Sequence, residues 1–381
     1  MIYFDNAATT KPYPEVVDSF RKVSLELFGN SESNHAIGLS ASRALEDART
    51  SILKVLNVEK THSLIFTSGA TEANNLALKG TTIHYKNRGK RILVSSTEHP
   101  SVYKPLEELT DLFGFEVIKL PVDSLGRVKV ESLSSCLDNQ TILVSVMAVN
   151  NEIGSQNDIT AIASIVHKFP KCFFHVDATQ ALGKVDLPYE KVDLLSFSSH
   201  KFGGLKGTGG LLYKKTMQFE PLLAGGEQEN GFRAGTTNVA GDVSTAKALE
   251  ISLSNRFKNY QNVKEIYEYL RGYFLSDPTQ YHVHSDEVSE KQTPYVLNVG
   301  LLKKKASVIV EALSNHGIYV SSVSACSSKE AHASNTLLAC GYSLEEASNS
   351  IRISFSSANT LLEAKEFVLT LKVIMKEVID R

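Results

Sequence analysis

Through Phe197 the chain alternates short, strongly apolar runs with longer stretches that carry apolar residues at helical spacing. The short runs have the length and the β-branched or aromatic residue types of buried strands. They span Leu64–Phe66, Ile92–Ser96, Ile142–Val149, Cys172–Val176 and Val192–Phe197. Residues 39–56 instead repeat apolar side chains on one face of a helix, at Leu45, Ala48, Ile52 and Leu56. This alternation predicts an α/β fold with a large, mostly parallel sheet.

The order and length of the predicted elements change after the glycine-rich stretch 203–210 and a return strand at Leu211–Tyr213. A charged helix begins near Asn255, and shorter strands and helices follow it at Val296–Val299, Ala306–Asn315, Ile318–Ser321, around Arg352 and from Leu361. This order is typical of a smaller α+β domain. We predict a large domain at 15–254 and a small domain that includes 255–381. The glycine stretch indicates turn geometry rather than a phosphate loop.

An acid and an amine follow two of the predicted strands. Asp177 comes directly after the run Cys172–Val176, and Lys201 ends the segment Ser198-Ser199-His200-Lys201 after the run Val192–Phe197. The carboxyl ends of neighbouring parallel strands share one crevice, where ligands of open α/β sheets bind. Pyridoxal phosphate needs both groups: a lysine holds its aldehyde as a Schiff base, and a carboxylate keeps its pyridine nitrogen protonated. The pair therefore indicates a pyridoxal-phosphate site.

Other strand ends carry polar side chains that suit the same cofactor. Thr67–Asn75 reads as a tight glycine turn and a helix start, whose free N–H groups, with the Thr71 and Ser198 hydroxyls, could hold a phosphate. A plain capped helix is the alternative interpretation. His99 follows the run Ile92–Ser96 and could stack on the cofactor ring or be an ordinary hydrogen-bonded histidine. Asn150 follows the run Ile142–Val149.

These residues carry a resemblance to a known family. The chain resembles the cysteine desulfurases of the NifS/IscS group, within the fold-type I, class V aminotransferase-like pyridoxal-phosphate enzymes. The matching motifs occur in one order at Phe4–Thr10, Phe28–Asn30, Thr67–Asn75, Thr97–His99, Val149–Gly154, His175–Gln180, Ser198–Lys201, Arg233–Thr236, Ser324–Ser328 and Ser350–Phe355. The resemblance covers the chain nearly end to end. It also implies that the extreme amino terminus, residues 1–14, joins 255–381 in the small domain.

The resemblance assigns roles position by position. It implies that Lys201 bonds the cofactor aldehyde, that Asp177 pairs with the pyridinium nitrogen, and that His99 stacks on the ring and moves protons. Gln180 would bond the phenolic oxygen of the ring. The phosphate would be held by Thr71, Ser198 and His200, with Thr236 from the neighbouring subunit of a homodimer, and Ala70 would also be a cofactor-binding residue. Asn150 and Arg352 match positions near the cofactor and the substrate carboxylate, and a guanidinium binds a carboxylate bidentately. An ion pair is the alternative for Arg352.

Cys326 separates this group from its aminotransferase relatives. It lies in a stretch of small polar residues, 321–328, which has too little apolar surface to pack firmly and which we expect to form a mobile loop. An average cysteine is a small buried hydrophobe. The match to the nucleophile loop of the family implies instead that Cys326 accepts the sulfur as a persulfide.

Composition indicates which partners and which compartment to expect. A formal charge of −2 over 381 residues predicts no nucleic-acid affinity. The four cysteines, Cys136, Cys172, Cys326 and Cys340, have no zinc or disulfide spacing, and we see neither a cleavable signal nor a membrane-length apolar run, so we expect a cytoplasmic protein. The eleven histidines include no two-histidine helical motif, so we predict no catalytic metal.

The predicted function is conversion of L-cysteine to L-alanine, with the sulfur passed through Cys326 to an acceptor protein. The acceptor would be a thiouridylase or an iron–sulfur scaffold. The chain ends at Arg381 without the longer tail of housekeeping iron–sulfur members, which favours tRNA thiolation. Two alternatives remain: another pyridoxal-phosphate aminotransferase or lyase in which Cys326 is incidental, and a non-catalytic assembly protein, which would be colourless.

Overall fold

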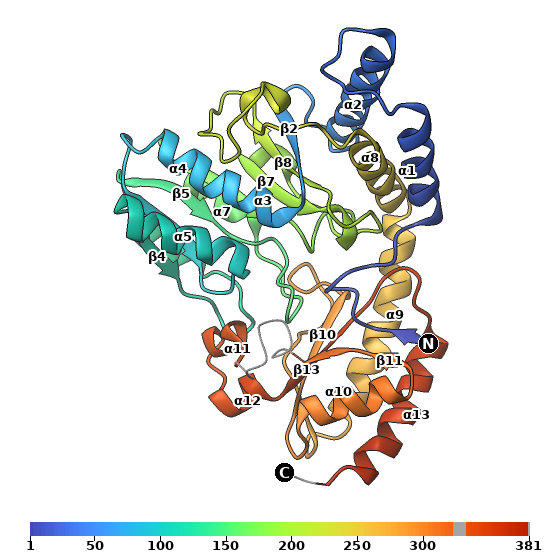
Figure 1. Ribbon diagram of the computed structural model, residues 1–381. Coiled ribbons are helices and arrows are strands. Elements are labelled where there is room, and N and C mark those ends of the chain that lie inside the picture. Colours follow the sequence, from blue (N-terminus) through green and yellow to red (C-terminus); the bar gives the residue numbers. More distant parts are fainter. Residues whose placement is uncertain (323–332, 380–381) are drawn as a thin grey trace.

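The structure is a computed structural model that describes residues 1–322 and 333–379. It has a large part built around one sheet and a smaller part beneath it, and helix α9 runs from the end of α8 into the smaller part (Figure 1). The chain begins in the smaller part, where Ile2 and Tyr3 pair with Ile318 and Tyr319 (Figure 1). No helix within the described ranges has the length and apolar content needed to cross a bilayer.

A seven-stranded sheet forms the centre of the large part, in the order β2-β8-β7-β6-β5-β3-β4. The strands are β2 (His62–Thr67), β3 (Arg91–Ser95), β4 (Glu116–Leu120), β5 (Thr141–Ser145), β6 (Phe173–Asp177), β7 (Leu194–Ser198) and β8 (Gly209–Lys214). Only β8 runs antiparallel to its neighbours in this sheet, and it is the return strand expected at Leu211–Tyr213. The predicted α/β fold with a mostly parallel sheet is confirmed.

Helices cover both faces of this sheet. They are α1 (Pro14–Glu26), α2 (Ala36–Val55), α3 (Ala70–Asn75), the π-helix η1 (Leu76–Gly80), α4 (Thr81–His84), α5 (Pro100–Phe113), α6 (Val130–Cys136), α7 (Ile159–Val166) and α8 (Val239–Ser254). On one face α3 and α5 bury Ala73 and Leu106, and on the other α2 and α8 bury Leu45 and Leu249. Helix α2 begins three residues before the predicted Leu39, because His35 caps it by accepting from the Gly38 N–H at 3.2 Å.

The smaller part has its own sheet and core. Its elements are β1 (Ile2–Tyr3), α9 (Arg256–Leu275), β9 (Tyr281–Val283), β10 (Val296–Leu301), α10 (Ala306–Asn315), β11 (Ile318–Tyr319), β12 (Ser321–Ser322), α11 (Asn335–Ala339), α12 (Leu344–Ser348), β13 (Ser350–Ser354) and α13 (Leu361–Glu377). Strands β12, β13, β10 and β9 form an antiparallel sheet, and β1 pairs with β11. The core combines Ile2 and Phe4 with apolar residues from Val263 to Met375. The domain boundaries at 14 and 255 stay a prediction.

Two predicted strands differ from the strands in the structure: one is divided in two, and the other ends early. The segment Ile318–Ser321 splits into β11 and β12, because β11 pairs with β1 while β12 pairs with β13. The run Ile142–Val149 ends as a strand at Ser145, although the Val146 and Ala148 N–H groups still bond to His175 and Asp177 carbonyls. The neighbouring strands β6 and β7 are parallel and aligned so that Asp177 lies opposite Ser196. Asp177 and the segment after Ser198 therefore emerge at the same edge of the sheet.

Candidate functional site

A cavity of about 410 Å³ opens at this edge, and its lining comes from both parts of the molecule. It lies within the size range of small-molecule sites. The predicted site residues that line it are Ala70, Thr71, His99, Asp177, Gln180, Ser198, His200, Lys201 and Arg352. The fold thus gathers side chains from five separate motifs around one space.

Asp177 is held in a fixed orientation at the end of β6. Its side chain is buried, with 4% of the residue exposed. One oxygen accepts from the Thr179 N–H and the other from the Asn74 side-chain amide, each at 2.9 Å. Asn74 also donates to Ser101 Oγ at 2.9 Å, and Ser101 Oγ lies 2.8 Å from His99 Nδ1. Asn74 and Ser101, to which the sequence assigned no role, therefore link the predicted acid to the predicted stacking residue.

His99 caps helix α5 and faces the cavity. Its Nδ1 accepts from the Ser101 N–H at 3.1 Å, so the proton of the neutral ring lies on Nε2. Burial lowers the pKa of His99, and the nearby Lys201 charge adds to this, whereas the Asp177 charge opposes it. A neutral imidazole with its N–H directed away from the helix end is the form suited to stacking and to hydrogen bonding with a ligand.

Lys201 ends the short helix η3 (Ser199–Lys201), directly after β7. Its Nζ donates to the carbonyls of Ala7 and Ala8, at 2.7 and 2.8 Å. The Ala7 carbonyl also accepts from Gln180 Nε2 at 2.9 Å. The amino-terminal segment therefore completes the cavity wall, and it brings the predicted amine and the predicted amide to one backbone oxygen.

A second lysine supports this arrangement from outside the cavity. Lys184 Nζ donates to Gln180 Oε1 at 3.1 Å, which orients the amide so that its NH₂ group faces Ala7. Burial lowers the pKa of Lys184 to about 7, with a further contribution from the Lys201 charge. Lys184 belongs to none of the sequence motifs described above. Its spacing of four residues from Gln180 is the one sequence feature that indicates the contact.

The phosphate end of the expected cofactor has a matching set of groups. A helical run begins at Ala70, and the Ala70 N–H donates to Ser198 Oγ at 2.7 Å. Gly69 has a φ of +149°, and a Cβ there would lie 3.2 Å from the same oxygen, so this turn requires glycine. His200 Nδ1 lies 3.0 Å from Thr9 Oγ1, and burial lowers the pKa of His200 to about 4. Residues 203–210 do not line the cavity, consistent with turn geometry.

Three predicted residues are not placed at the cavity. The Asn150 side chain is fully buried beneath it, where it donates to the Thr97 carbonyl and accepts from the N–H groups of Glu152 and Ile153. Thr236 is exposed and is absent from the cavity lining. Cys326 lies outside the described residues. The roles of all three stay predictions.

Arg352 lines the cavity and also forms an ion pair. Its Nη2 lies 3.0 Å from Asp5 Oδ1, and its Nη1 donates to the Asn151 carbonyl at 3.1 Å. Its Nε is buried and has no hydrogen-bond partner in the part of the chain that the structure describes. Both interpretations of this arginine are therefore compatible: the Asp5 pair fixes the guanidinium at the cavity, where a substrate carboxylate could reach it.

Glu98 is a further site residue, for which no role was predicted. It lines the cavity, and its Oε1 accepts from Ser95 Oγ and the Met147 N–H, both at 2.6 Å. Its Oε2 is buried without a hydrogen-bond partner among the described residues. Burial, followed by the charge of Asp177, raises the pKa of Glu98 to about 8. Glu98 is therefore a protonated acid at neutral pH.

Replacing Glu98 by glutamine should flatten the pH dependence of stability. The raised pKa stabilises the folded protein fully below the unfolded pKa of about 4.3, and this contribution is lost as the pH rises through about 8. Within that window the loss is up to about 1.4 kcal/mol per pH unit. Urea unfolding of the parent and of Glu98→Gln across the window measures the difference. Parallel pH curves for the two proteins would contradict the assigned ionisation.

The described residues fit pyridoxal phosphate. A buried, oriented carboxylate and a lysine amine reach one cavity from adjacent strand ends, and a glycine turn with a serine hydroxyl and a helix start lies beside them. His99 lines the same cavity, and burial lowers its pKa, which favours the neutral ring. The arrangement can hold a planar, anionic cofactor at its ring nitrogen, aldehyde and phosphate.

Comparisons with known proteins agree with this geometry. Residues 2–367 match the family model described as aminotransferase class-V. The chain is 40% identical to a NifS/IcsS protein homolog of Lactobacillus delbrueckii subsp. bulgaricus, over 97% of this chain and 95% of that protein. It is 37% identical to the cysteine desulfurase IscS of Dictyoglomus turgidum, over 94% and 90% respectively. The solved structure of a NifS-like protein superposes with a TM-score of 0.90 at 34% identity, covering 99% of this chain and 100% of that one.

Proposed function

Because the chain belongs to the class-V aminotransferase family and is a cysteine desulfurase of its NifS/IscS group, we propose that the cavity at Asp177 and Lys201 is where it acts on L-cysteine. The observation that carries this proposal is the meeting of the buried Asp177 carboxylate and the Lys201 amine at adjacent strand ends. Pyridoxal phosphate, held there, would supply the electron sink that makes the carbon–sulfur bond of the substrate cleavable.

Each residue of the cavity has a distinct task in this proposal. Asp177, oriented by Asn74 and the Thr179 N–H, keeps a negative charge directed at the ring nitrogen. Lys201 Nζ moves protons at the substrate carbon once its bonds to the Ala7 and Ala8 carbonyls are exchanged. Arg352, fixed by Asp5, receives the carboxylate of the substrate.

The overall reaction balances without an external oxidant. The Cys326 thiolate forms a bond to the sulfur of L-cysteine, and the carbon–sulfur bond of the substrate breaks. The proton lost by the substrate thiol is matched by one gained at the carbon that becomes the methyl group of L-alanine. The sulfur then leaves as a persulfide on Cys326, ready for transfer to an acceptor protein.

The deciding experiment is a spectrum followed by a product assay. The purified protein should be yellow, and with L-cysteine and a reductant it should release equal amounts of alanine and sulfide. A coloured protein that releases no sulfide would be another pyridoxal-phosphate enzyme. A colourless protein that binds no added cofactor would be a non-catalytic assembly protein.

The physiological setting forms the finer part of the proposal. We propose a cytoplasmic enzyme that passes sulfur to a protein acceptor, either a thiouridylase or an iron–sulfur scaffold, with tRNA thiolation preferred. The support is chemical: the three cysteines among the described residues, Cys136, Cys172 and Cys340, are unpaired, as expected in a reducing compartment. Measuring thiolated tRNA and iron–sulfur enzyme activities after deletion of the gene would separate the two acceptors.

The enzyme should act as a homodimer with shared sites. Thr236 is exposed and outside the cavity of its own chain, which supports a role in the partner subunit. Mixing a Lys201→Ala chain with a Thr236→Ala chain should then create one intact site in each mixed dimer and restore turnover with parent-like cofactor affinity. If Thr236 acts within its own chain, every active site in the mixture keeps the weakened affinity of Thr236→Ala.

A further inference from the structure

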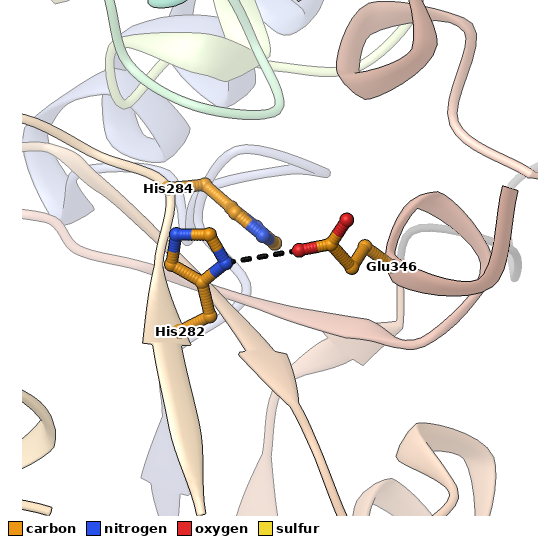
Figure 2. Close-up of side chains that lie close together, drawn as sticks. All are labelled: His282, His284 and Glu346. Carbon is orange, nitrogen blue, oxygen red and sulfur yellow. Dashed lines mark hydrogen bonds and ion pairs between the residues drawn. The ribbon is translucent and has the colours of Figure 1, made fainter. Parts of the chain in front are cut away.

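Two histidines and a glutamate meet in the smaller part of the molecule, outside the cavity. His282 lies on β9, His284 follows that strand, and Glu346 lies on α12. Figure 2 shows the Glu346 carboxylate facing both imidazoles. One potential ligand atom from each residue lies within 4.8 Å of the other two, and His282 Nδ1 is 3.1 Å from Glu346 Oε1.

The protonation of His284 is fixed by its neighbours. Asn298 Nδ2 donates to the Glu152 carbonyl at 3.1 Å, which establishes Asn298 Oδ1 as the acceptor 2.7 Å from His284 Nδ1. The proton of a neutral His284 ring therefore lies on Nδ1, and Nε2 carries a lone pair. His284 is 2% exposed, and its Nε2 has no hydrogen-bond partner among the residues that the structure describes. A buried, unpartnered imidazole nitrogen with an oriented N–H opposite is how metal-ligating histidines are typically held.

The surroundings keep the three groups in place. A Cβ at Gly300 would lie 3.0 Å from His284 Cε1 and 3.2 Å from Nε2, so glycine leaves room for the ring. The Tyr342 ring packs on both imidazoles, with centroids 5.5 and 4.5 Å away. Glu346 Oε2 accepts from the Ser343 N–H and hydroxyl in a capping box, which leaves Oε1 for the histidines.

We propose that His282, His284 and Glu346 form a binding site for a divalent zinc-type cation. Two imidazoles and one carboxylate are a common zinc ligand set, with bond lengths of about 2.0–2.2 Å and a fourth position for water. Tetrahedral ligands at such lengths lie about 3.3–3.5 Å apart. The His282–Glu346 separation of 3.1 Å is already close to that, and the other separations among the three ligand atoms are all within 4.8 Å. Partial exposure of His282 and Glu346 leaves an entry path and an open fourth position.

The cation would connect α12 to β9 and thereby hold one wall of the cavity. Helix α11 precedes α12, and its capping residue Ser334 lines the cavity and donates to the Glu152 carboxylate. On the other side Asn298 bonds both His284 and the Glu152 backbone. Glu152 therefore connects the two sites: its carboxylate bonds a residue of the cavity wall, and its carbonyl bonds the residue that orients His284. The site is independent of the Lys201 chemistry and stands whether or not the proposed reaction does.

Zinc binding to the cofactor-loaded protein tests the site. A Cys326→Ser background removes the predicted reactive thiol as a competing ligand. We expect one Zn²⁺ per chain by titration against a chromophoric chelator, and a Co²⁺ spectrum with visible bands but no thiolate charge-transfer band. Glu346→Gln, which preserves the capping box, and His284→Gln should each abolish stoichiometric binding. Asn298→Ala should weaken binding about 10- to 100-fold.

The control is His316→Gln, at an exposed histidine at the end of α10, which should bind zinc like the parent. Retained cofactor absorbance and circular dichroism in each variant establish that it is folded. The proposal is overturned if the Cys326→Ser protein binds less than one equivalent of Zn²⁺. It is also overturned if Glu346→Gln, folded by these criteria, retains the parent affinity.

Discussion

Lys201→Ala is expected to abolish alanine formation and to remove the visible absorbance of the lysine-bound cofactor. Lys201 is the amine that the fold brings into the cavity, 2.7 and 2.8 Å from the Ala7 and Ala8 carbonyls. Loss of its proton transfer alone lowers a rate by about 10²- to 10⁴-fold, and loss of the covalent anchor adds to that. Alanine assays under saturating cofactor, with spectra of the same samples, measure both effects.

Lys184 provides the matched control for this prediction. It is a second buried lysine, bonded to Gln180, and its lowered pKa makes it the rival amine. Lys184→Met should keep the visible absorbance, although its spectrum and pH profile should shift because Gln180 loses its orienting donor. A Lys201→Ala protein with parent turnover, or a Lys184→Met protein without the absorbance band, would show that the amine has been misassigned.

The chemistry at the strand ends could be predicted because it depends on local sequence. A buried apolar run followed by Asp177, and another followed by Ser198 and Lys201, places both groups at one sheet edge once the strands are parallel neighbours. Helix α10 begins and ends at the predicted Ala306 and Asn315 for a similar reason, since its amphipathic period lies within the segment itself. Such features require no knowledge of distant contacts.

The supporting contacts could not be predicted because they join distant segments. The Ala7 carbonyl accepts from Lys201, which lies 194 residues later in the sequence, and Asp5 pairs with Arg352, which lies 347 residues later. The raised pKa of Glu98 depends on its burial, and the position of a glutamate after a strand does not predict whether it is buried. The pair His282 and His284 does not have the helical spacing of a two-histidine motif. The two residues lie two positions apart at the end of β9, and in an extended chain that spacing puts both side chains on one face.

Cys326→Ala should separate cofactor binding from sulfur transfer. The mutant should bind pyridoxal phosphate and L-cysteine, as judged by its spectra, because Asp177, Lys201 and Arg352, which line the cavity, are unchanged in it. Its alanine production should nonetheless fall to the rate measured without enzyme, since no thiolate is present to accept the sulfur. Mass spectrometry of the parent after brief exposure to L-cysteine should find one extra sulfur on the peptide that contains Cys326.

The other cysteines are the controls, and their surroundings explain why their replacement should not change alanine production. Burial raises the pKa of the Cys340 thiol to about 12, and burial raises the pKa of Cys172 further still, so neither forms a thiolate at neutral pH. Cys136 ends helix α6 and is absent from the cavity lining. Serine at each of these three positions should leave alanine production intact and affect only stability, through lost packing. Extra sulfur on Cys340, or full alanine production by Cys326→Ala, would show that Cys326 is not the nucleophile. The roles of Lys201 and Asp177 would be unaffected by that result.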